Sequence, residues 1–362
     1  MGAVKLVIMK STKHILISAL LLLLAVCLQG CGGHGKESEL VFKDVRQCRL
    51  ETCSEPFFCD TYKDLWVLDD CFVVVGYSRA SEKYIHVFDK QTGAYKSSFV
   101  ARGRSGDEVL SVTDTYLAGD ELYIWDAMQK ALISCDLGDA MNAVALPLTR
   151  YDGLAGPAYT HILSNGRRAV MVANASFIEN APINDKPRLL SVDLLSGDEA
   201  SYDGYPINDR FKTWWMYMQP VISTNRSMQK IALLSNCYYG CVMELFEASA
   251  DTIRCTHTQT LSPPDFEGKA NGATPGDALC YGAIDAVCTD DYVIVAFDGE
   301  TRVTDKDAAS SFNKVLWFDW SGKPVRKLVI DRSVTCLCMD KQDLYALVRT
   351  EDGDAVIVRI YF

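Results

Sequence analysis

The chain has 362 residues, with 36 lysines and arginines against 47 acidic residues, so its formal net charge is −11. This balance excludes the basic surface that nucleic-acid binding requires, and we expect no nucleic-acid partner. Charged residues make up 23% and hydrophobic residues 49%, which excludes a disordered chain and allows a large folded core. The length alone corresponds to two or three ordinary domains or to one large repetitive one.

The first thirty residues predict a signal peptide. Lysines are the only charged residues before His34, at Lys5, Lys10 and Lys13, and an apolar run over 15–28 follows them. This run is too short for a comfortable membrane span and is typical of a signal-peptide core. Either Met1 or Met9 can be the initiator, since Lys10 after Met9 opens a shorter signal of the usual kind.

The apolar run ends on Leu28-Gln29-Gly30-Cys31, which resembles a bacterial lipobox. A leucine three residues before the cysteine and a small residue directly before it predict cleavage there and lipid attachment to Cys31. The alternative is an ordinary signal peptide with a chance cysteine. Residues 31–39 are glycine-rich and predict a flexible tether. Cleavage would change the formal charge from −11 to −14, so diacylglyceryl and acyl chains such as palmitate, rather than electrostatics, would hold the protein at the membrane.

A repeated unit follows the tether. A polar turn and then an apolar run recur six times, with starts 47 to 62 residues apart, at Phe72, Leu122, Ala169, Ile231, Tyr292 and Leu344. In most units a first strand precedes the turn, and a third strand ends in an apolar residue followed by aspartate, at Asp89, Asp136, Asp193 and Asp319. A glycine turn and a fourth strand complete the unit. Four antiparallel strands in about 50 residues are typical of a propeller blade.

The two ends of the chain predict a closed ring. The sixth unit stops after its third strand, 355–360, whereas the apolar-rich segment Leu40–Leu50 precedes the first unit. If this N-terminal strand completes the last blade, no sheet edge is left exposed. We therefore predict an all-β, six-bladed propeller over 40–362. A seven-bladed ring is the main alternative, because the two longest intervals can hide extra strands, and a pair of β-sandwiches is another.

The connector after the first unit supports a family resemblance. Its residues Ala-Arg-Gly-Arg-Ser-Gly-Asp-Glu, 101–108, are glycine-rich and close on Gly106-Asp107-Glu108. With the lipobox and six irregular blades, this connector resembles the TolB-like six-bladed propeller lipoproteins of Bacteroidota. Ser105 stands where that family more often has glycine or proline. The resemblance implies a propeller in a cell envelope and no established reaction, and we expect an outer-membrane lipoprotein on the periplasmic face or the cell surface.

Cysteines and histidines give no motif for a cofactor or metal, and we expect neither. Most cysteines beyond Cys31 lie in apolar strands and are expected to be buried free thiols, while the regions Cys48–Cys59 and Cys237–Cys241 are the favoured places for a disulfide. The histidines of the repeats are scattered over three units, so we expect each to lie apart from the others: His86, His161 and His257.

Two segments are candidate binding sites for a ligand or partner. Arg102, Arg104, Asp107 and Glu108 can line a polar mouth, or they can form a salt-bridged turn that sets the angle between two blades. Within 211–217 lie Trp214 and Trp215, whose rings can stack on a sugar or peptide, or can pack against a blade instead.

The expected function is that of a binding or interaction module, with an envelope protein or a glycan as its partner, and we assign no catalytic residue. The alternative is an enzyme of the lactonase, hydrolase or glycan-active kind with carboxylates or a metal on the ring axis. Carboxylates paired across a cleft, or converging metal ligands, would favour the enzyme. Four acidic residues can contribute to such a site: Asp107, Glu108, Asp285 and Asp298.

Overall fold

The computed structural model describes residues 40–142, 146–152, 159–173, 187–204, 220–237, 240–263, 265–269, 272–305 and 310–362. The chain divides into residues 1–40 and residues 41–362, and the second unit is described here. Cys31 lies outside the described residues. Within the described ranges, no helix is long and apolar enough to cross a membrane.

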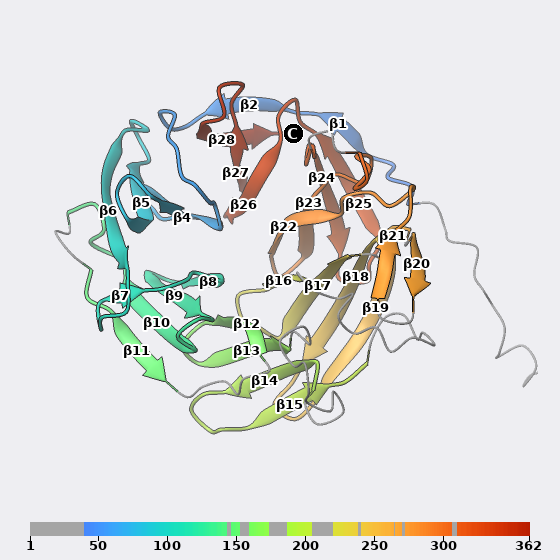
Figure 1. The fold of residues 1–362 in the computed structure, drawn as a ribbon, viewed down its shortest axis with the longest axis horizontal. Coiled ribbons are helices and arrows are strands. Elements are labelled where there is room, and N and C mark those ends of the chain that lie inside the picture. Colours follow the sequence, from blue (N-terminus) through green and yellow to red (C-terminus); the bar gives the residue numbers. More distant parts are fainter. Residues whose placement is uncertain are drawn as a thin grey trace, which may run out of the picture. The chain divides into compact units, whose positions relative to one another are not determined.

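The described residues of 41–362 form six blades, each with four antiparallel strands, around a common axis (Figure 1). Blade 1 contains β3 (Asp64–Val67), β4 (Cys71–Ser78), β5 (Lys83–Asp89) and β6 (Tyr95–Arg102). Blade 2 contains β8 (Asp114–Ala118), β9 (Glu121–Asp126), β10 (Ala131–Asp136) and β11 (Thr149–Asp152). Blade 3 contains β12 (Tyr159–Ser164), β13 (Arg168–Ala173), β14 (Leu189–Asp193) and β15 (Glu199–Tyr202).

The second half of the ring repeats this order. Blade 4 contains β16 (Pro220–Thr224), β17 (Lys230–Cys237), β18 (Gly240–Ala248) and β19 (Ile253–Ser262). Blade 5 contains β22 (Ala283–Cys288), β23 (Tyr292–Phe297), β24 (Lys314–Asp319) and β25 (Pro324–Val329). Blade 6 contains β26 (Val334–Asp340), β27 (Asp343–Arg349), β28 (Ala355–Tyr361) and β2 (Arg49–Thr52). In every blade the strand that comes first in this order lies nearest the axis (Figure 1).

The ring closes through the N-terminal segment, as the sequence predicts. Strand β2 pairs antiparallel with β28, so that Leu50 lies opposite Ile360 and supplies the missing outer strand of blade 6. The preceding strand β1 (Val45–Gln47) joins blade 5 instead, in parallel with β25. The predicted closing segment therefore spans two blades, and only its last part completes the sixth.

The described parts of the two long sequence intervals contain no seventh blade. The interval before Tyr292 holds a separate two-stranded hairpin of β20 (Phe266–Lys269) and β21 (Gly272–Pro275). The interval before Ile231 contains 174–186 and 205–219, which lie outside the described residues. Six sheets around one axis confirm the six-bladed propeller and exclude the pair of β-sandwiches.

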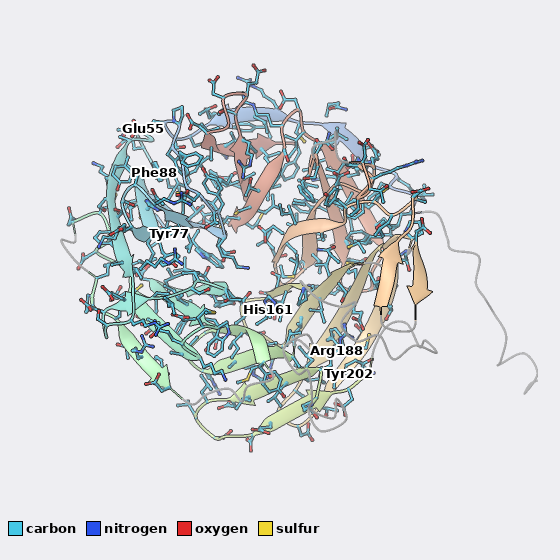
Figure 2. The ribbon with its side chains drawn as sticks, in the orientation of Figure 1. Glu55, Tyr77, Phe88, His161, Arg188 and Tyr202 are labelled. Atoms are coloured by element: carbon cyan, nitrogen blue, oxygen red, sulfur yellow. The ribbon has the colours of Figure 1, made fainter. Side chains whose placement is uncertain are left out.

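The core lies between neighbouring blades. In β4, Val73 and Val75 pack toward blade 2, while Phe72 and Val74 pack toward blade 6. Phe88 of β5 belongs to the same layer as Phe72 (Figure 2). Because successive side chains of a strand point to opposite faces and both faces are covered, these strands are continuously apolar rather than alternating.

The aspartate that ends the third strand of a blade forms the turn that follows it. The Oδ1 atom of Asp89 accepts hydrogen bonds from the backbone amides of Gln91 and Thr92, at 3.0 and 2.7 Å. The Thr92 amide and hydroxyl hold the pKa of Asp89 below its usual value. Asp193 and Asp319 accept the equivalent backbone hydrogen bonds. The repeated sequence pattern is therefore a carboxylate-capped turn.

Ten cysteines in the described part of the chain agree with the prediction of free thiols. Cys48 and Cys59 carry free thiols, so no disulfide forms in that region. The side chain of Cys237 is outside the described part of the chain, and the prediction for 237–241 stays untested. Eight more described cysteines are free thiols: Cys53, Cys71, Cys135, Cys255, Cys280, Cys288, Cys336 and Cys338.

Candidate functional site

A cavity of about 660 Å³ lies on the ring axis. Its wall contains residues from the innermost strand of every blade, namely β3, β8, β12, β16, β22 and β26. These strands run in the same direction around the axis, so residues at corresponding positions of different blades converge. The cavity is large enough for a small-molecule ligand, since binding pockets typically measure about 300–1,000 Å³.

Charged side chains gather where the innermost strands begin. Lys63, which precedes β3, places its Nζ 3.5 Å from Oδ1 of Asp114 in β8. The same Oδ1 lies 3.1 Å from Nδ1 of His161 in β12 (Figure 2). Despite its burial, the interactions of Asp114 with His161 and Lys63 keep its pKa below the usual value. Asp114 is therefore a carboxylate held by two neighbouring blades.

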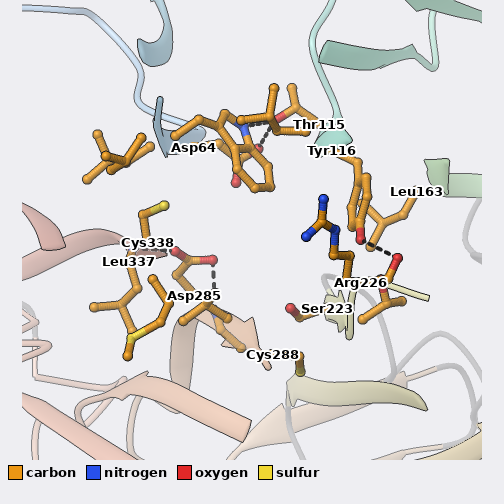
Figure 3. A pocket seen from close by; sticks show the side chains of 18 of the residues that line it. Asp64, Thr115, Tyr116, Leu163, Ser223, Arg226, Asp285, Cys288, Leu337 and Cys338 are labelled. Atoms are coloured by element: carbon orange, nitrogen blue, oxygen red, sulfur yellow. Dashed lines mark hydrogen bonds between the residues drawn. The ribbon is translucent and has the colours of Figure 1, made fainter. Parts of the chain in front are cut away.

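Two further carboxyl groups face the cavity, from Asp64 in β3 and Asp285 in β22 (Figure 3). Asp64 accepts a hydrogen bond of 2.5 Å from the Thr115 hydroxyl. Burial raises the pKa of Asp64, against the opposing charge of Lys63. Burial also raises the pKa of Asp285, and the negative charge of Asp64 raises it further. The pair thus carries more negative charge than its surroundings favour.

These aspartates also connect the blades. Asp114 Oδ2 accepts a hydrogen bond from the backbone amide of Ile162 in blade 3, at 3.0 Å. Asp285 Oδ2 accepts one from the amide of Leu337 in blade 6, at 2.6 Å. The bond from the Thr115 hydroxyl to Asp64 also links blade 1 to blade 2. Backbone amides therefore fix the carboxyl groups of Asp114 and Asp285, and a side-chain hydroxyl fixes that of Asp64.

Arg226 approaches the cavity from the turn between β16 and β17. Its backbone carbonyl accepts a hydrogen bond from the Tyr116 hydroxyl at 3.4 Å, and its guanidinium points into the cavity (Figure 3). Within the described ranges, the structure records no ion pair for this guanidinium. By contrast, Lys341 at the same end lies 3.7 Å from Asp69. Arg226 is thus a cation available to a ligand.

The cysteines in the cavity wall are unsuited to nucleophilic catalysis. Burial raises the pKa of Cys288 and of Cys338 to about 12. Both thiols therefore remain protonated near neutral pH, whereas the thiolate is the reactive form.

The charged connector lies elsewhere, at the outer edge of blade 1. Its last residues form β7 (Glu108–Val109), which pairs in parallel with the outermost strand β6. The Ser105 amide donates to Oε2 of Glu108 at 2.9 Å, and the Ser105 hydroxyl donates to Oδ1 of Asp107 at 2.5 Å.

The two arginines of the connector are exposed. The Arg102 guanidinium lies 4.9 Å from the centre of the Tyr77 ring, and Arg104 also faces solvent. None of Arg102, Arg104, Asp107 and Glu108 lines the axial cavity. The connector is therefore closer to the predicted turn between blades than to a polar mouth. Hydrogen bonds within the loop, rather than salt bridges, hold this turn together. A binding role for these residues stays a prediction.

The remaining predicted residues divide between described and undescribed parts. Trp214 and Trp215 lie outside the described residues. Of the four acidic residues considered for an axial site, only Asp285 lines the cavity. Asp298 instead caps a turn by accepting backbone hydrogen bonds from Glu300, Thr301 and Ser311. Among the described residues, no group of three or more histidine, cysteine or acidic side chains is placed to hold a metal ion.

Sequence reasoning missed most of the axial site, namely Lys63, Asp64, Asp114 and Arg226. One local signal was present. Asp64 and Asp114 begin, and Asp285 interrupts, a first strand that is otherwise apolar or uncharged, although a half-buried strand does not favour aspartate. An acidic residue at this position of a blade can only be recognised once the axis of the ring is known.

Six four-stranded blades around an axial cavity define a six-bladed β-propeller, and two sequence families agree. The family described as "TolB-like 6-blade propeller-like" matches residues 221–342. A family described as "6-bladed beta-propeller" matches residues 35–167. The predicted resemblance to TolB-like propellers is confirmed at this level, and its lipoprotein part stays a prediction. A search of curated protein sequences finds no match.

Solved structures show the same fold at low sequence identity. A Bacteroides fragilis protein described as exported aligns with a TM-score of 0.55 and 9% identity, over 90% of this chain and 98% of that one. A member of the DUF4221 family from Bacteroides vulgatus aligns with a TM-score of 0.53 and 8% identity, over 89% and 98%. A luciferin-regenerating enzyme aligns at 0.50 and 9% identity, over 87% and 95%. These likenesses concern the fold alone.

Proposed function

We propose that this protein is a lipid-anchored binding module of a bacterial cell envelope, and that its axial cavity holds a small polar ligand. The observation that carries the proposal is the axial cavity itself, which Arg226 and the carboxyls of Asp64 and Asp285 line together. A few polar groups that converge in one cavity fix the orientation of a ligand, so a ligand that pairs with them gains affinity and specificity.

The envelope setting rests on the N-terminal sequence. The lipobox-like segment before Cys31 supports an acyl anchor, and the likeness to an exported Bacteroides propeller accords with it. A rigid ring on a flexible tether would present the cavity near the membrane to a soluble ligand or to a ligand carried by an envelope protein.

Replacing Cys31 by alanine tests the anchor. Without the thiol no diacylglyceryl group can be attached, so we expect the variant to leave the membrane fraction and to lose label from radioactive palmitate. Cys48→Ala, which removes a thiol from the ring but leaves the lipobox intact, is the control and should stay with the membrane. A Cys31→Ala protein that remained membrane-bound and labelled would contradict the anchor.

The carboxyl pair favours one alternative, a hydrolase that works at the same place. A carboxyl group whose pKa is raised can act as a general acid when a second carboxylate lies nearby. Whether a bound compound is released unchanged or hydrolysed distinguishes binding from this reaction.

Native mass spectrometry of the purified protein with a mixture of ligands tests both functions. The mixture contains neutral sugars, sugar lactones, amino acids, dipeptides, dicarboxylates and divalent metal salts. We expect the wild-type protein to retain one class of compound with its mass unchanged. The Arg226→Gln variant should retain less of the same compound. Conversion to a hydrolysed mass would favour the enzyme. Retention of no compound would contradict an axial binding site of either kind.

A further inference from the structure

The charges of the axial cavity are unequally distributed. At the end where the innermost strands begin, Asp64, Asp114 and Asp285 surround one ammonium group, that of Lys63. Asp114 is already engaged by Lys63 and His161. Lys63 therefore offsets only part of the negative charge of Asp64 and Asp285, and within the described ranges the structure records no ion pair for either carboxyl.

The other titratable groups around this pair do not supply the missing charge. Cys288 of β22 and Cys336 and Cys338 of β26 are protonated, because burial raises the pKa of each. Arg226 is a cation that faces the same space from blade 4, but within the described ranges the structure records no ion pair between it and either carboxyl. At neutral pH the carboxyl pair thus tends to retain a proton, as expected for two like charges with raised pKa values.

A cationic ligand can take the place of this proton. An ammonium group placed between the two carboxylates would supply the positive charge that the proton supplies in the empty cavity, and one proton would leave to solvent. Charge-assisted hydrogen bonds from ammonium to carboxylate are among the stronger polar contacts in proteins. The backbone amides of Ala286 and Leu337 already hold the Asp285 carboxylate in place.

Arg226 supplies the opposite charge on the opposite wall. Its guanidinium extends from the turn after β16 into the cavity that Asp285 also lines (Figure 3). A guanidinium matches a carboxylate in shape and donates two parallel hydrogen bonds to it. The cavity therefore places an anion-binding group across from a cation-binding pair.

The aromatic side chains of the wall make a neutral sugar a poorer match. Trp66 and Tyr116 pack edge to face, with ring centroids 6.1 Å apart. The Trp66 Nε1 donates to Thr115 at 2.9 Å, and the Tyr116 hydroxyl donates to backbone carbonyls. The polar atoms of both rings are thus already engaged within the wall, and the charged groups are left to recognise a ligand.

We propose that the axial cavity binds a zwitterion of the amino-acid or short-peptide class, with its amino group between Asp64 and Asp285 and its carboxylate on Arg226. This assignment rests on the proposed function and specifies its ligand. A volume of about 660 Å³ accommodates a dipeptide.

The test uses the whole mature chain and a randomised dipeptide mixture, read by native mass spectrometry and then by calorimetry on the dipeptide retained. We expect binding of free dipeptides, and loss of binding when the mixture is N-acetylated or C-amidated. Asp285→Asn and Arg226→Gln should each weaken binding by about tenfold or more, because each removes one charged partner. Equal retention of the capped mixtures would overturn the proposal.

Matched controls come from the connector at the outer edge of blade 1. Arg104→Gln and Asp107→Asn remove the same charges from exposed positions, and we expect affinity within about twofold of wild type, since surface charges far from a site contribute little. If these two variants weaken binding and the axial pair does not, the connector is the site and the axial assignment is wrong. Asp64→Asn gives a second axial variant should Asp285→Asn fail to fold.

The pH dependence adds a readout that needs no variant. Since the ammonium replaces a proton, affinity should rise between pH 5 and pH 8, and heats measured in buffers of different ionisation enthalpy should show net proton release. Binding that is independent of pH, without proton release, would contradict the exchange. If dipeptides fail but a dicarboxylate, sugar or metal salt is retained, the ligand class is wrong while the axial binding function stands. If nothing is retained, both fail.

Discussion

Replacing Glu244 by glutamine should destabilise the ring by about 3 kcal/mol, because it removes one half of a buried ion pair. Arg188, directly before β14, donates to the two carboxylate oxygens of Glu244 in β18, at 3.0 and 2.5 Å. Both side chains are nearly inaccessible, at 4% and 1% exposure. The pair joins blade 3 to blade 4, with Arg188 placed as in Figure 2. Chemical unfolding of the variant measures the loss.

The same strand provides the matched control. Glu247 pairs with Arg254 at 2.7 Å, but these side chains are 59% and 72% exposed. Exposed ion pairs contribute about 0–1 kcal/mol, so Glu247→Gln should change the free energy of unfolding by less than that amount. Similar losses for the two variants would show that the Arg188–Glu244 pair does not hold blades 3 and 4 together.

Replacing Asp285 by asparagine should stabilise the empty protein at pH 8, whereas replacing Glu244 by glutamine should destabilise it. Burial and the charge of Asp64 raise the pKa of Asp285 in the folded protein, so the folded state binds more protons than the unfolded state above pH 4. The free energy of unfolding therefore falls as pH rises through this window. The amide cannot ionise, and its one oxygen can still accept from Leu337, although the Ala286 amide loses its acceptor. We therefore expect a net gain of about 1 kcal/mol at pH 8 and no gain at pH 4.

Asp298 is the control for the direction of this pH dependence, because its pKa is shifted the other way. Hydrogen bonds from the amides of Thr301, Glu300 and Ser311 hold its pKa below the usual value despite burial. Its contribution is therefore present above the unfolded pKa and is lost as the pH falls through the folded one. Asp298→Asn should lower the free energy of unfolding at pH 8. A loss of stability in both variants at pH 8 would mean that the Asp285 carboxylate is favourably placed in the empty cavity.

The opposite effects of Asp285 on stability and on binding would identify a functional residue. A charge that lowers the stability of the empty ring is retained only if something else makes use of it. Asp114 does not share this property, because Lys63 and His161 already hold its charge. Asp285 is thus the carboxyl group whose charge should lower the stability of the empty protein and strengthen ligand binding.

The blades could be predicted because their signals are local. Each unit is recognisable in the sequence by a turn, an apolar run and an aspartate, such as Asp89, whose side chain caps the next turn. These interactions span only a few residues, so their spacing is visible in the sequence. The closure of the ring could also be predicted, since blade 6 lacks a strand in the sequence and an apolar segment precedes blade 1. The division of that segment between β1 and β2 depends on pairing over nearly the whole chain.

The axial site was largely beyond sequence reasoning for the opposite reason. Lys63 and Asp285 are separated by more than half of the chain and meet only because each lies near the start of an innermost strand. No local motif joins them. The connector of Arg104 and Asp107 attracted attention because its charges are adjacent in sequence, and adjacency there reflects a self-contained turn.

A crystal structure of the mature protein with a retained dipeptide tests the axial site most directly. We predict electron density on the ring axis, with the amino group within hydrogen-bonding distance of Asp64 and Asp285 and the carboxylate on Arg226. Density for the dipeptide at the outer edge of blade 1, or an axis that holds only solvent while the dipeptide is bound elsewhere, would contradict it.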